Sequence, residues 1–149
     1  MIAAAVFACA EPVQAGVNDT EIIIYRFPGV TNTGNDFQGR ATVFNCTNFS
    51  GVPESIRFVT RTNGGDLLGN TAGNLNHLAT VTAATHNTIS YVSLLNILSF
   101  QATFQGTTAI AATSTNIICT AMVIDASTVA PIGVALRGIR FAPVSGSQE

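Results

Sequence analysis

Three cysteines, Cys9, Cys46 and Cys119, are the side chains with the clearest covalent chemistry in this chain. Cys9 lies in the opening stretch MIAAAVFACAEPVQA, which is mostly small and apolar and ends in a small-x-small pattern typical of signal-peptidase cleavage before Gly16. Cleavage would remove Cys9 and leave an even pair. Because a lone pair in a secreted domain usually forms a disulfide, we predict a bond between Cys46 and Cys119. The alternative is two separate buried thiols.

The leader has two other interpretations. Residues 6–9 also fit a lipobox, which would leave a lipid on Cys9, and the lack of a basic start fits an apolar N-terminus that is retained. We expect residues 1–15 to be a cleaved signal peptide or lipoprotein leader and residues 16–149 to form a single domain. No later run reaches the roughly 18 apolar residues of a membrane-spanning helix, so we expect no transmembrane segment in the mature chain. The expected location is extracellular, periplasmic or at the cell surface.

The other residues with catalytic or metal-binding chemistry form no recognised motif. His77 and His86 lie in polar, loop-like surroundings without zinc spacing, and we expect them to be solvated or singly hydrogen-bonded. The loops at 32–36 and 63–66 carry one carboxylate each, fewer than a calcium site usually gathers. A Gly-x-Ser-x-Gly nucleophile elbow is absent. We therefore predict no catalysis, no cofactor and no metal site.

The charge content is low. Charged residues make up 9% of the chain, against a typical share of about 25%, and the net charge is −2. The six basic residues are arginines without a cluster, so the chain offers no gathered cations for phosphates. We expect no nucleic-acid partner, and a surface built from Thr, Ser, Asn and Gln.

Alternating apolar residues between Gly, Pro and Asn turns predict a succession of short strands. The expected strands are 21–27, 39–51, 54–62, a return strand from 67, 78–82, 85–91, 106–112, 117–124 and a last strand from 131. Residues 63–66, Asn-Gly-Gly-Asp, form the strongest hairpin turn, because Asn and Gly accept positive φ angles. Beyond Gly138 the alternation shifts by one residue, which predicts a β-bulge.

One segment has a helical spacing instead. Tyr91, Leu94, Leu95 and Leu98 recur at intervals of three and four, which predicts one short helix near residues 90–99. The rest of the pattern predicts an all-β fold, an antiparallel two-sheet sandwich of about seven to nine strands.

With one cysteine on an early strand and the other on a late one, the layout resembles extracellular immunoglobulin-like domains. This resemblance implies two sheets face to face, each with one inward cysteine. The chain departs from antibody domains in having no Trp and in having Ile117 where a tyrosine corner would place Tyr. No functional residue follows from a match of layout.

The sequence indicates function mainly through strands that are apolar on both faces. The strands at 21–27 and 117–124 are the two clear cases, because each has apolar residues at both odd and even positions. The residues concerned in the first strand are Ile22, Ile23, Ile24, Tyr25 and Phe27. One explanation is a sheet edge that adds to another subunit. The other is that the predicted helix and long loops cover these faces within the monomer.

We therefore expect a secreted or cell-surface protein with a structural or protein-interaction role, without catalysis, that binds a protein partner or itself. The alternative is a monomeric ligand-binding or inhibitor domain that uses the loops at one end of the sandwich.

Overall fold

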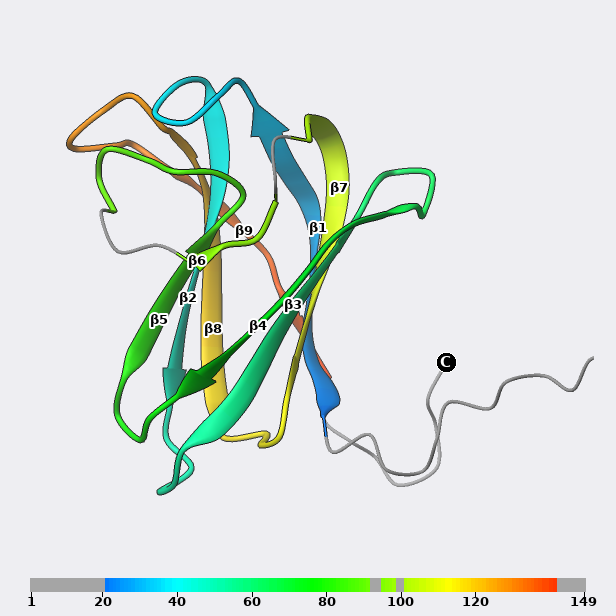
Figure 1. Ribbon diagram of the computed structural model, residues 1–149, viewed down its shortest axis with the longest axis vertical. Helices are drawn as coiled ribbons and strands as arrows, with labels where there is room; N and C mark the ends of the chain where they lie inside the picture. The colour runs from blue at the N-terminus through cyan, green and yellow to red at the C-terminus, as the bar shows by residue number, and fades with distance from the viewer. Residues whose placement is uncertain (1–20, 92–94, 99–100, 142–149) are drawn as a thin grey trace, which may run out of the picture.

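The computed structural model describes residues 21–91, 95–98 and 101–141. These residues form an all-β fold without a helix, in which ten strands belong to one mixed sheet that curves nearly into a barrel (Figure 1). The strands are β1 (Ile22–Thr33), β2 (Arg40–Asn48), β3 (Glu54–Arg61), β4 (Leu67–Leu75), β5 (Thr80–Ala84), β6 (Leu95–Asn96), β7 (Thr103–Ala112), β8 (Ile117–Asp125), β9 (Val134–Leu136) and β10 (Ile139–Arg140).

The pairings divide the strands into two groups that are joined at two places. One group runs β4–β3–β7–β1, and the other runs β6–β5–β2–β8–β9. The groups are joined first where the end of β1 pairs with the start of β2. They are joined again by β10, which follows β9 of the second group in the chain and pairs with β1 of the first. Two separate immunoglobulin-like sheets are therefore not confirmed, and the parallel β5–β6 pair makes the sheet mixed rather than purely antiparallel.

The predicted disulfide between Cys46 and Cys119 is present, but its place in the fold is not the expected one. β2 and β8 are antiparallel neighbours over nine register pairs, and Cys46 lies directly opposite Cys119 with the Cα atoms 4.1 Å apart. This is the short separation of cross-strand neighbours at a non-hydrogen-bonded pair. The bond links two strands within one sheet, so the expectation that it clamps two facing sheets was wrong.

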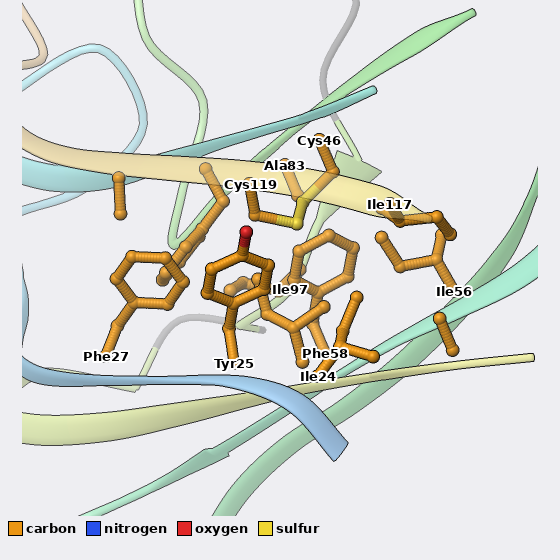
Figure 2. Close-up of a cluster of buried hydrophobic side chains, with 14 of the residues drawn as sticks. Ile24, Tyr25, Phe27, Cys46, Ile56, Phe58, Ala83, Ile97, Ile117 and Cys119 are labelled. Carbon is orange, nitrogen blue, oxygen red and sulfur yellow. A yellow bond between two sulfur atoms is a disulfide. The ribbon is translucent and has the colours of Figure 1, made fainter. Parts of the chain in front are cut away.

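The core lies between the two strand groups and includes the disulfide. Four aromatic rings from three strands follow one another through it, with centroid separations of 5.5–5.9 Å along the series Tyr25, Phe27, Phe44 and Phe58. Figure 2 shows Tyr25 extending from β1 toward the Cys46–Cys119 bond, with Phe58 and Ile24 beside it. Because these side chains come from strands far apart in the sequence, the core depends on long-range pairing.

No described residue of the segment predicted to be a helix is helical. Leu95 and Asn96 form β6, and the amide of Ile97 donates to the carbonyl of Ala84 at 2.9 Å. Ile97 and Leu98 are buried. The helix prediction was wrong because apolar spacing in so short a run does not separate helix from strand, and hydrogen bonds to β5 decide for the extended form. Residues 92–94 and 99, within the predicted range, lie outside the described residues.

Gly138 lies at a break between two strands rather than at a bulge within one strand. β9 ends two residues before it and is paired with β8, whereas β10 begins directly after it and is paired with β1. A Cβ atom at position 138 would lie 2.4 Å from the ring of Phe27. The shift in alternation therefore marks the point where the chain passes from one group of strands to the other.

Candidate functional site

The predicted association edge does not lie at a free edge of the sheet. β1 pairs with β7 from Ile22 to Asn32, and its other side pairs with β10 at Tyr25 and Arg26. The edge interpretation was therefore wrong, because pairing partners that are distant in sequence occupy both sides of the strand.

A bulge explains why this strand is apolar on both parities. The register against β7 shifts between Ile23 and Tyr25, which leaves Ile24 as an extra residue. Ile24, Tyr25 and Phe27 are all buried and Ile22 is partly buried, so only Ile23 is exposed, at 39%. The explanation that these residues are covered within the monomer fits their burial, although β7, β10 and the core cover them rather than a helix.

The two histidines have different environments. His77 is exposed and its Nδ1 accepts a hydrogen bond from the amide of Gly51 at 3.1 Å, as predicted for a singly bonded histidine. His86 is only 4% exposed, so the expectation of a solvated ring was wrong for it. Its Nε2 lies 3.0 Å from the carbonyl of Gln38, and its Nδ1 contacts Oδ1 of Asn32. Burial lowers the pKa of His86, opposed by the Gln38 hydrogen bond and the negative charge of Asp36.

These contacts hold the loop at 34–39 against the segment that follows β5, at the end of the fold where three loops gather (Figure 1). The carboxylate of Asp36 accepts hydrogen bonds from the amide and side chain of Asn87, at 3.1 and 2.9 Å. Phe37 donates its amide to the carbonyl of Asn87 at 2.8 Å and has a φ of 63°. A left-handed conformation is costly for a phenylalanine, and the fixed neighbours on both sides hold it in place.

A depression of about 370 Å³ lies beside this loop. It is lined by Phe37, Asn87, Thr88, Ile89 and Tyr91. The hydroxyl of Thr88 is buried and has no hydrogen-bond partner among the described residues. This lining, with three apolar or aromatic side chains and two polar ones, matches the composition of a small-molecule site.

A second depression, of about 540 Å³, has a more exposed apolar lining. Three of its side chains, Phe104, Ile132 and Val134, are 72%, 96% and 70% exposed, and we call them the apolar face. Phe104 lies at the start of β7, whereas the other two belong to the segment that leads into and begins β9. Residues distant in sequence thus meet on one surface.

Opposite charges border the apolar face. Arg40 and Asp125 line the same depression and are directly opposite each other in the β2–β8 pairing. Two hydrogen bonds from Ser127 lower the pKa of the Asp125 carboxyl, which is therefore ionised at neutral pH. Within the described residues the Arg40 guanidinium makes no ion pair or hydrogen bond.

The apolar face was not among the surfaces predicted from the sequence. Residues 129–136, VAPIGVAL, are almost wholly apolar and include the start of the strand expected from 131, yet Pro131 and Gly133 interrupt any strict alternation. None of residues 127–141 is buried. An apolar run without a clear period was the available signal that this segment does not enter the core.

Comparison with known proteins found no family model, no curated protein and no solved structure that matches this chain. Among the described residues, no three His, Cys, Asp or Glu side chains are close enough to hold a metal ion. No helix in the described part of the chain is long and apolar enough to cross a membrane.

Proposed function

We propose that this protein is a secreted or cell-surface β-domain with a structural or protein-interaction role, that it associates with itself, and that it has no catalytic activity. The observation that carries the proposal is the apolar face formed by Phe104, Ile132 and Val134. Single exposed apolar residues are ordinary, but several that border one depression are typical of an interaction surface.

The expected strength is modest. Complete burial of a large apolar side chain stabilises by about 1.5–3 kcal/mol, so the three on one copy contribute about 4.5–9 kcal/mol. Association costs an estimated 4–15 kcal/mol in lost freedom of motion. The gain is of the same size as the cost, so the apolar face supports a stable complex only together with further contacts around it.

The disulfide supports the proposed location. Structural disulfides persist mainly in oxidising compartments, and the Cys46–Cys119 bond is a buried part of the core. The leader-like residues 1–15 support the same location, either by cleavage or by lipidation at Cys9, and these residues lie outside the described part of the chain.

The environment of His86 supports a non-catalytic role. A general base must reach the proton it removes, whereas this ring is buried with both nitrogens against oxygen atoms of Gln38 and Asn32. Its contacts serve to hold the loop at 34–39.

We also propose that the two strand groups are the two layers of an immunoglobulin-like sandwich. The β1–β2 and β9–β10 connections would link these layers at their edges. The row of core rings between the groups supports it.

Sedimentation velocity of the purified protein, from low to high micromolar concentration, tests self-association. We expect a sedimentation coefficient that rises with concentration. A single monomeric species throughout would overturn self-association and favour the alternative, a monomeric ligand-binding domain. The depression beside Phe37 supports that alternative, and a thermal-shift screen that compares the protein with Phe37→Ala would then test it.

A further inference from the structure

We infer that the apolar face binds a second copy of this chain across a two-fold axis, with Arg40 of each copy paired to Asp125 of the other. The inference rests on the proposed function, because it names the surface and the occupant for the proposed self-association. It is carried by the arrangement of charge around one apolar depression.

The surface combines exposed apolar side chains with one adjacent pair of opposite charges. The side chains of the apolar face protrude from two distant segments, β7 and the chain leading into β9. Beside them stand one cation and one anion at paired positions of β2 and β8. Because the cation and the anion lie side by side on adjacent strands, a two-fold axis that passes between them brings each sign opposite its complement in a second copy.

The charge distribution of the chain favours this occupant. A partner rich in either sign would meet one like charge at this border, whereas a second copy meets two opposite charges. The net charge of −2 creates little repulsion between copies. Hydrogen bonds from Ser127 keep the Asp125 carboxylate ionised, so both members of each pair are charged at neutral pH.

A charge exchange between two variants tests the pairing across copies. Arg40→Asp leaves two acidic groups at the border, and Asp125→Arg leaves two basic groups. Each variant alone would bring like charges together, and we expect its self-association to weaken by about tenfold or more. An equimolar mixture of the two variants restores both opposite-charge pairs in a mixed dimer, so association should return in the mixture.

The mixture is the decisive measurement, since a purely structural effect of either substitution would not be reversed by adding the other variant. Near-ultraviolet circular dichroism and the melting temperature establish that each variant is folded. Sedimentation of the mixture that equals the sum of two folded monomers would overturn the inference.

A second pair of variants keeps the test independent of the charges. Phe104→Ser removes the aromatic side chain of the apolar face, and Phe49→Ser is its matched control, a half-exposed phenylalanine that does not line the depression. We expect only Phe104→Ser to weaken association. If the unmodified protein associates and none of these variants changes it, the surface is wrong while the proposed function stands. If the unmodified protein is monomeric, the proposed function itself fails.

Discussion

Removal of the Cys46–Cys119 disulfide should lower the free energy of unfolding by about 4 kcal/mol. The bond joins positions 73 residues apart, and the entropy lost by closing a loop of that length in the unfolded chain corresponds to about 4 kcal/mol at room temperature. Nine register pairs hold β2 against β8 around the bond, so the native contacts should survive its loss. The effect should therefore arise mainly in the unfolded state.

This magnitude is large for a domain of this size. Each kcal/mol lowers the melting temperature by about 3–5 °C, so we expect a decrease of roughly 12–20 °C. Thermal or urea unfolding followed by circular dichroism measures it, with the unmodified protein in reducing buffer as an independent route to the same state.

The single and double alanine variants separate cross-linking from packing. Cys46→Ala and Cys119→Ala each break the same bond, so each should cost about 4 kcal/mol, and the double variant should cost little more than either. Losses that add to about 8 kcal/mol would show that each sulfur acts through its own packing and would refute the reasoning. Two titratable thiols in the native protein would refute the bond itself.

Two further predictions concern stability. Because burial lowers the pKa of His86 in the folded state, its contribution is fully present above the unfolded value of about 6.5 and is lost as pH falls toward the folded pKa. His86→Gln should flatten the pH dependence of the melting temperature between about pH 7 and 5; a profile equal to that of the unmodified protein would contradict this. Gly138→Ala should destabilise by about 1–3 kcal/mol, because its Cβ would lie 2.4 Å from a core phenylalanine ring. In the control Gly73→Ala the nearest atom is 3.8 Å away, so urea midpoints that fall equally would disprove the steric explanation.

Local patterns in the sequence were sufficient for most of the strands and turns, although the strand expected at 85–91 does not form. The hairpin at 63–66 forms as predicted between β3 and β4, with Gly65 at a φ of 94°, because turn chemistry acts within four residues. The disulfide partners were also predictable, since the third cysteine, Cys9, lies in the leader-like residues 1–15. The all-β class followed from the alternation and the β-branched residues alone.

Long-range pairing decided the rest. Hydrogen bonds between segments far apart in the chain make β2 and β8 neighbours and pair β1 on both sides. Such bonds also keep residues 95–98 extended. A period of two tells which residues share a face, but it does not tell which strand lies beside them. For the same reason the burial of His86 and the exposure of Ile132 were not predictable: an imidazole is buried only where oxygen atoms from distant loops surround it, and an isoleucine stays exposed where no other element packs over its segment.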